Sequence, residues 1–214
     1  MDEIRVAQLL VKSLEQHKNR GKQVSEPLDR ECGHFHAVQF YSDELSLAQF
    51  VAGFLAEGFD AGDAGVIIAT PEHRVLIEAQ LRHRQIDVDS LKRMGELAVV
   101  DARETLQMFM VNGVPHAPTF HYVLGRVLDQ VCRAHPGSTI RAYGEMVNVL
   151  WRDRIEAAAI RLETLWNELA QSRHFKLLCG YSMGNFYKGT ALDDIKGLHS
   201  HLSDGNAVAT RQLI

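Results

Sequence analysis

Short apolar runs alternate with amphipathic stretches along the chain from residue 34 onward. The runs that are apolar or rich in β-branched residues predict five strands, at residues 34–41, 65–70, 96–102, 138–146 and 174–183. Helical spacing of apolar residues predicts helices at residues 44–57, from Pro71 onward, and at 103–110, 120–134, 155–170 and 190–203. Strands that alternate with helices predict βαβ units with right-handed crossovers, and therefore an α/β fold around a mostly parallel sheet of five or more strands.

The first 30 residues have a different pattern. Residues 4–18 place apolar side chains on one helical stripe, and the following stretch is polar with glycine and proline. We therefore expect two parts: an amphipathic helix and linker over residues 1–30, and one α/β domain over residues 31–214.

Composition narrows the class of protein without identifying a function. Of the 214 residues, 46% are hydrophobic and 23% are charged, which is typical of a globular chain. The net charge of −4 gives no reason to expect nucleic acid as a partner. No apolar run reaches the roughly 20 residues that span a membrane, and the acidic N-terminus does not resemble a signal peptide. Three widely spaced cysteines do not suggest a disulfide framework, so a cytoplasmic location is expected.

Topology predicts where a ligand would bind. In an open parallel sheet, ligands bind beyond the carboxyl ends of the strands, where the following helices present unpaired N–H groups. This rim mixes aromatic, thioether, carboxylate and cationic side chains, which suits a small, partly apolar ligand held by a few polar groups. Its candidate ligand-binding residues are Tyr41, Asp43, Thr70, His73, Arg74, Asp101, Glu145, Met146, Tyr181 and Met183.

Several of these residues also have a structural interpretation. Thr70 and Asp101 stand where helix-capping residues are common, and Tyr41 and Met183 could pack at the edge of the core. A buried Glu145 must be hydrogen-bonded or functional, and a salt bridge to Arg141 or Arg74 is the structural alternative. The sequence leaves these alternatives open.

Motifs for common chemistries are missing from the chain. A phosphate-binding loop needs GxxxxGK[ST], whereas ATPEHR (residues 69–74) follows the second strand, which argues against ATP hydrolysis. No GxSxG elbow is present, and Cys179 is interpreted as a small buried hydrophobe. His199 and His201 are two apart on a predicted helix, so they would not share a face, and no HExxH occurs. We therefore predict no catalytic residue, no metal and no cofactor.

Five segments together resemble one family: HAVQFYSDE, GVIIATPEHR, RAYGEMVNVLW, AAAIRLETLWNELA and LLCGYSMGNF. In this order, over roughly residues 34–203, they resemble MEDS domains, sensory domains named for methanogen and methylotroph proteins and a dichloromethane-responsive regulator. The resemblance implies a RecA-like or clock-ATPase-like fold with a degenerate phosphate loop. It also implies a sensory role in prokaryotic signal transduction, with simple hydrocarbon derivatives as ligands. By motif match, the resemblance also implies a set of ligand-binding positions in this chain: His36, Gln39, Tyr41, Thr70, Arg74, Gly144, Glu145, Met146 and Trp151.

Two functional hypotheses follow. The first is a non-enzymatic sensory domain that binds a small organic ligand at the rim and signals by protein–protein contact. Its partner would be a histidine kinase, a sigma-factor regulator, another signalling protein or a second copy of the chain, with no contact to nucleic acid or membrane. The alternative is a nucleotide-binding regulator or a small-molecule enzyme that uses the same cleft.

Overall fold

The computed structural model describes residues 35–186, 192–203 and 211–212, so the predicted N-terminal helix and linker lie outside the described residues. The main sheet has the strand order β3-β2-β6-β7-β1-β8-β9, and every neighbouring pair is parallel except β8 with β9. The strands of this sheet are β1 (His36–Tyr41), β2 (Ala64–Ala69), β3 (Leu97–Asp101), β6 (Ile140–Gly144), β7 (Phe175–Ser182), β8 (His201–Ser203) and β9 (Arg211–Gln212). The predicted α/β fold with a mostly parallel sheet is confirmed.

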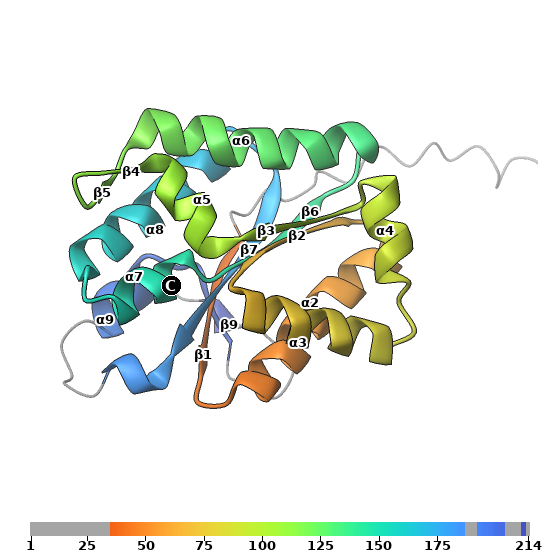
Figure 1. Ribbon diagram of the computed structural model, residues 1–214, viewed down its shortest axis with the longest axis horizontal. Coiled ribbons are helices and arrows are strands. Elements are labelled where there is room, and N and C mark those ends of the chain that lie inside the picture. The colour runs from red at the N-terminus through yellow and green to blue at the C-terminus, as the bar shows by residue number, and fades with distance from the viewer. Residues whose placement is uncertain (1–34, 187–191, 204–210, 213–214) are drawn as a thin grey trace, which may run out of the picture. The chain divides into compact units, whose positions relative to one another are not determined.

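The helices cover both faces of this sheet (Figure 1). Their bounds are α2 (Glu44–Asp60), α3 (Pro71–His83), α4 (Val88–Met94), α5 (Ala102–Phe109), α6 (Ala117–Ala134), α7 (Met146–Arg152), α8 (Glu156–Ala170) and α9 (Leu192–Gly197). Apolar side chains of α2, α3 and α4 pack on one face, and those of α5, α6, α7, α8 and α9 pack on the other. None of the helices in the described part of the chain combines the length and apolar character needed to cross a membrane.

Strand β2 shows why the sheet is buried on both sides. Val66 and Ile68 belong to the core under α5–α8, whereas Ile67 and Ala69 belong to the core under α2–α4. Successive side chains of a strand point to opposite faces, so a strand covered on both faces must be apolar throughout. This is the pattern from which the strand was predicted.

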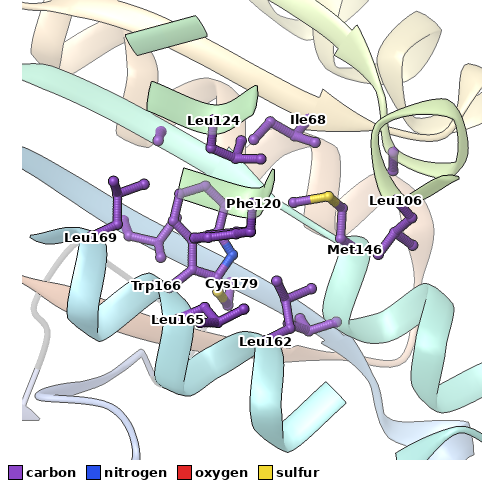
Figure 2. Close-up of a cluster of buried hydrophobic side chains, with 14 of the residues drawn as sticks. Ile68, Leu106, Phe120, Leu124, Met146, Leu162, Leu165, Trp166, Leu169 and Cys179 are labelled. Carbon is purple, nitrogen blue, oxygen red and sulfur yellow. The ribbon is translucent and has the colours of Figure 1, made fainter. Parts of the chain in front are cut away.

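The larger core lies between the sheet and helices α6 and α8 (Figure 2). Phe120 and Trp166 meet edge to face, with ring centroids 5.3 Å apart. Met146, which the sequence placed among the ligand-binding residues, is fully buried in this core with Ile68 and Leu106. Its thioether therefore fills space between α7 and the sheet.

Three local predictions need correction. A small hairpin, β4 (Met110–Val111) with β5 (Val114–Pro115), replaces the end of the predicted helix 103–110 and the start of the predicted loop 112–119. Its turn is Asn112-Gly113, where both residues have positive φ, as a two-residue hairpin turn favours. The predicted strand 138–146 ends at Gly144, and α7 follows after Glu145.

The last predicted helix, at residues 190–203, is also shorter than expected. Helix α9 ends at Gly197, and the chain re-enters the sheet as β8 from His201. Ser200 ends this connection by donating a backbone hydrogen bond of 2.8 Å to the carbonyl of His36 on β1. His199 and His201 therefore lie in a turn and a strand, not on a helix.

Candidate functional site

A cavity of about 210 Å³ lies where the carboxyl ends of β1, β2 and β7 meet the first turns of α2 and α3 and helix α7. It occupies the rim that the topology predicted. The lining residues are Tyr41, Ser42, Glu44, Thr70, Glu72, His73, Asn148, Arg152 and Ser182. Apart from the ring of Tyr41, these side chains are polar or charged, so the cavity is more polar than the sequence led us to expect.

Glu145 connects the strand ends beside this cavity. It is 1% exposed, and its carboxylate accepts hydrogen bonds from the backbone N–H of Thr70, from Nδ1 of His73 and from the hydroxyl of Tyr143. Neither predicted salt-bridge partner reaches it, because Arg141 pairs with Asp63 and Arg74 pairs with Asp101. The carboxylate is therefore held by three donors from strand β6, the end of β2 and helix α3.

Asn148 forms a second clamp across the cavity. Its Nδ2 donates to the Tyr41 hydroxyl over 3.1 Å, and its Oδ1 accepts the backbone N–H of Ser182 over 3.0 Å. One side chain of α7 thus ties the carboxyl ends of β1 and β7 together. Because the Tyr41 hydroxyl accepts from Asn148, its own proton can be directed at a bound molecule.

Burial and the carboxylate of Glu145 determine the protonation states of the ionisable side chains around the cavity. Burial, followed by the nearby charges of Glu145 and Glu44, raises the pKa of Tyr41 far above its ordinary value, and burial with the charge of Glu145 does the same to the pKa of Tyr143. Both phenols therefore stay protonated. Burial alone would lower the pKa of His73, but its hydrogen bond to Glu145 and the charges of Glu145 and Glu44 outweigh this and raise it.

Arg152 supplies the cation of the cavity. Its side chain is exposed and forms no ion pair with any residue that the structure describes. Arg152 and Asn148 are four residues apart, so both lie on the cavity-facing side of α7. Neither residue was among the predicted site residues because this helix was not predicted, although the spacing in NVLWR would have placed both on one face.

Other predicted site residues have structural roles. Asp43 caps α2, since its carboxylate accepts the N–H of Ser46 over 2.7 Å. Asp101 caps α5 and pairs with Arg74 over 3.1 Å. Met183 is 43% exposed and does not line the cavity. Thr70 occupies the N-cap position of α3, but its hydroxyl makes no capping hydrogen bond and it lines the cavity instead.

The remaining predicted residues are buried away from the cavity lining. Trp151 and Tyr181 contact each other edge to face, with ring centroids 6.3 Å apart, in the core under α8. Gln39 is 6% exposed and donates its amide to the Phe40 carbonyl over 2.8 Å. His36 is fully buried at the start of β1, at the opposite end of the strand from Tyr41.

A larger cavity of about 570 Å³ runs beside the edge strand β3. The charges of its lining are paired: Lys92 with Glu78, and Arg74 with Asp101 outside the lining, although Nε of Arg74 makes no hydrogen bond to a described residue. Of the residues predicted to bind a ligand, only Arg74 lies along it. We therefore place the candidate ligand site at the smaller cavity, where the polar groups converge.

The residues that could hold a metal lie elsewhere. His36, Glu163, Cys179 and His199 each offer one ligand atom, and these atoms lie within 4.8 Å of one another. All four side chains are buried. This cluster was not predicted, since 163 residues separate its first and last members and His199 was assigned to a helix.

Known proteins with a similar fold support the architecture. A KaiC-like protein from Pyrococcus horikoshii superimposes with a TM-score of 0.54 at 14% identity, over 78% of this chain and 70% of that one. An uncharacterised protein from the same organism, solved in complex with an unknown peptide, gives a TM-score of 0.58 at 12% identity, over 82% and 80%. These similarities confirm the expected RecA-like fold. Both connections that could carry a phosphate loop, Ser42-Asp43 after β1 and Thr70 after β2, lack glycine.

Sequence comparison adds a short match and a long one. A UPF0273 protein from Pyrobaculum aerophilum is 43% identical over 49 residues, which is 23% of this chain and only 17% of that protein. The sequence profile described as "MEthanogen/methylotroph, DcmR Sensory domain" matches residues 35–200, nearly the whole described part of the chain. The chain therefore belongs to the MEDS family of sensory domains.

Proposed function

We propose that this chain is a non-enzymatic sensory module, which binds a small organic molecule in the 210 Å³ cavity and reports binding through contact with another protein. Membership of a sensory-domain family supports a role in signalling. The observation that carries the ligand proposal is Arg152, a cation at the cavity without an ion-pair partner among the described residues, beside the Tyr41–Asn148 clamp. A polar ligand would give Arg152 an ion-pair or hydrogen-bond partner and would accept a hydrogen bond from the Tyr41 hydroxyl.

The cavity restricts the chemistry of the ligand. Its volume is below the roughly 300–1,000 Å³ of pockets that bind drug-sized molecules, so the ligand must be small. Arg152, the Tyr41 hydroxyl and the Thr70 hydroxyl can donate to an oxygen or a carboxylate, while the Tyr41 ring offers an apolar surface. A short hydrocarbon derivative that carries one oxygen-containing group fits this combination.

A ligand in this cavity would bridge elements from both faces of the sheet. Glu44 and Glu72 come from the first turns of α2 and α3, whereas Arg152 comes from α7 on the opposite face. A molecule that contacts both sides favours one arrangement of these helices over another, and this difference in affinity is what a sensor needs. A histidine kinase, a sigma-factor regulator or a second copy of the chain would then distinguish the two arrangements.

The alternative, a nucleotide-binding regulator, is favoured by the KaiC-like fold alone. The strand–helix connections at the cavity are too short and lack the glycines that let backbone amides surround a phosphate. Glu44 and Glu72 also place two carboxylates at the lining, which repel phosphate groups. The lining therefore favours a small organic ligand over a nucleotide.

Native mass spectrometry of the purified full chain tests the proposal. We expect a small organic molecule to co-purify with the wild-type protein and to raise its melting temperature when added back. Arg152→Ala should lose this molecule and the thermal shift, while Arg133→Ala, which removes an exposed arginine from the end of α6, should keep both. A ligand retained equally by Arg152→Ala would place binding outside the cavity. Bound nucleotide, or turnover of added ATP, would support the alternative.

A further inference from the structure

A buried cluster of polar side chains lies away from the ligand cavity, under α8. It joins four segments that are distant in sequence: His36 from β1, Glu163 from α8, Cys179 from β7 and His199 from the turn after α9. None of the four side chains has exposed surface. Ionisable groups in such a position must be paired with one another or must coordinate a metal.

Four contacts within the cluster have close to the spacing of a tetrahedral metal centre. Zinc bonds of about 2.0–2.3 Å place neighbouring tetrahedral ligand atoms about 3.3–3.8 Å apart. Nε2 of His36 lies 3.2 Å from Oε2 of Glu163 and 3.3 Å from Sγ of Cys179. Nε2 of His199 lies 3.4 Å from Oε1 of Glu163, and Sγ of Cys179 lies 3.6 Å from Oε2 of Glu163. These contacts use both oxygens of Glu163, and ligand atoms taken one from each residue lie within 4.8 Å of one another, so the four side chains converge near metal-ligand spacing.

The outer contacts orient both imidazole rings towards the centre of the cluster. Nδ1 of His199 lies 2.7 Å from the carbonyl oxygen of Ile195, which can only accept. Nδ1 of His36 lies 2.8 Å from Oδ1 of Asn167, and the amide of Asn167 is fixed in this orientation by its own donation to the Leu198 carbonyl over 3.0 Å. Each ring therefore carries a proton on Nδ1 and directs Nε2 inward. Metal-ligating histidines are held by second contacts of this kind.

Without a metal ion, a second proton on the His199 ring would have to balance the buried charge of Glu163 across the 3.4 Å between Nε2 and Oε1. With Nδ1 protonated, a neutral imidazole presents a lone pair at Nε2, and here both lone pairs face the same carboxylate. Nε2 of His199 is buried and has no hydrogen-bond partner among the residues that the structure describes. The hydroxyl of Tyr181 donates to Oε1 of Glu163 over 2.7 Å, which orients the carboxylate but adds no charge to balance it.

We propose that His36, Glu163, Cys179 and His199 bind one divalent transition-metal ion, and that Zn²⁺ is the ion this site fits best. Two imidazole nitrogens, a thiolate and a carboxylate form a mixed ligand set that suits the borderline-soft zinc ion in a tetrahedral geometry. All four positions are supplied by buried protein side chains, which is typical of a structural site and not of a catalytic one.

A metal at this site would fix the described C-terminal segment, residues 192–203, to the sheet. His199 belongs to this segment, and its neighbour Ser200 exchanges hydrogen bonds with the backbone of His36. Strand β8 of the same segment pairs with β1 through Ala37 and Val38. The ion would therefore stabilise the added edge of the sheet as well as the packing of α8.

Metal titration of the full chain tests this proposal. The protein is stripped with a chelator and then titrated with cobalt chloride and zinc sulfate. We expect one tightly bound ion per chain by mass spectrometry, a thiolate-to-cobalt charge-transfer absorption band, and a higher melting temperature with either metal. A wild-type protein that shows no such band and no thermal shift would overturn the proposal, because the four groups would then form only a hydrogen-bonded network.

Variants locate the ion. Cys179→Ser should abolish the charge-transfer band, and His199→Gln should weaken cobalt binding by at least about tenfold. Cys132→Ser, which removes the exposed cysteine on α6, should leave both the band and the affinity unchanged. A band that survives in Cys179→Ser but disappears in Cys132→Ser would assign the metal to an adventitious surface site. The titration of the wild-type protein tests the proposal by itself, so the proposal can still be decided if a variant folds poorly.

Discussion

The carboxylate of Glu145 accepts a hydrogen bond from the backbone N–H of Thr70, and this contact joins the ends of two neighbouring strands. Thr70 follows β2 directly, and Glu145 follows β6. Buried carboxylates are stable only when donors surround them, and here His73 and Tyr143 complete the set. Glu145 therefore holds Thr70 and His73, two lining residues of the candidate cavity, and we expect its effect on a ligand to be indirect.

Glu145→Gln should destabilise the protein even without a ligand. A glutamine offers one acceptor oxygen, and its NH₂ group would face a donor that the carboxylate now accepts. We expect the free energy of unfolding in urea to fall by about 1–3 kcal/mol. Glu104→Gln, at an exposed position on α5, is the matched control and should change it little. Wild-type stability in Glu145→Gln, combined with loss of ligand, would instead make this residue a direct ligand contact.

Gly180 gives Tyr143 the space to reach Glu145. A Cβ added at residue 180 of β7 would lie 2.7 Å from the Tyr143 hydroxyl oxygen, which is closer than a Cβ atom approaches other heavy atoms in real proteins. Gly180→Ala should therefore displace the phenol and cost about 1–3 kcal/mol of stability, measured by urea unfolding. The glycine in LLCGY thus has a packing reason that the sequence pattern alone did not reveal.

A double-mutant cycle checks that explanation. In a Tyr143→Phe background the hydroxyl is absent, so adding Gly180→Ala should cost less than it does in the wild type. Some cost should remain, because two ring carbons of Tyr143 lie 3.1 and 3.3 Å from the added Cβ. Equal costs in both backgrounds would mean that the hydroxyl does not limit the space at this position.

The sequence predicted the fold well because buried parallel strands have a strong signature. The run at 65–70 is apolar on both faces since both faces are covered, and the observed strand is Ala64–Ala69. Helix α7 was missed for the same reason. Met146 to Trp151 are all buried, and Asn148 and Arg152 are the polar side chains of this short helix, so its helical period is weak and its first residue was assigned to the preceding strand.

The candidate site was harder to predict because its geometry depends on long-range contacts. A cavity lies at the predicted rim, yet local sequence could not show that Glu145 would meet His73 across 72 residues. It also could not show that the rings of His36 and His199, from opposite ends of the described chain, would come together with centroids 4.1 Å apart and planes inclined at 46°. Motifs defined by sequence spacing detect ligand residues that lie within one helix, strand or loop. They miss ligand residues that come from four separate segments.

Asp43 and Thr70 hold the same helix-start position but should respond differently to alanine. Asp43→Ala removes a side chain that accepts the N–H of Ser46, so α2 should lose its cap and the melting temperature should fall. Thr70→Ala removes no capping bond and should leave the melting temperature of the ligand-free protein close to that of the wild type. Ligand-induced stabilisation should show the opposite order, because Thr70 lines the cavity and Asp43 does not.

The contact between His73 and Glu145 should make stability depend on pH. Glu145 and Glu44 raise the pKa of His73 in the folded protein above its unfolded value of about 6.5, despite the opposing effect of burial. A raised folded pKa means that the folded state binds the proton more tightly, so the stabilisation is fully present below about pH 6.5. It is lost as the pH rises through the folded pKa. The difference in unfolding free energy between wild type and His73→Gln should therefore be larger at about pH 6 than at about pH 8.

Urea unfolding of both proteins at several pH values measures this difference, and subtraction removes titrations that the two share. His83→Gln, at an exposed position in the last turn of the same helix α3, controls for losing a histidine. Its difference from the wild type should vary less with pH than that of His73→Gln, because no carboxylate partner holds its ring among the described residues. A wild-type advantage over His73→Gln that grows towards pH 8 would reverse the sign. It would mean that the folded protein holds His73 neutral and that burial outweighs the attraction of Glu145.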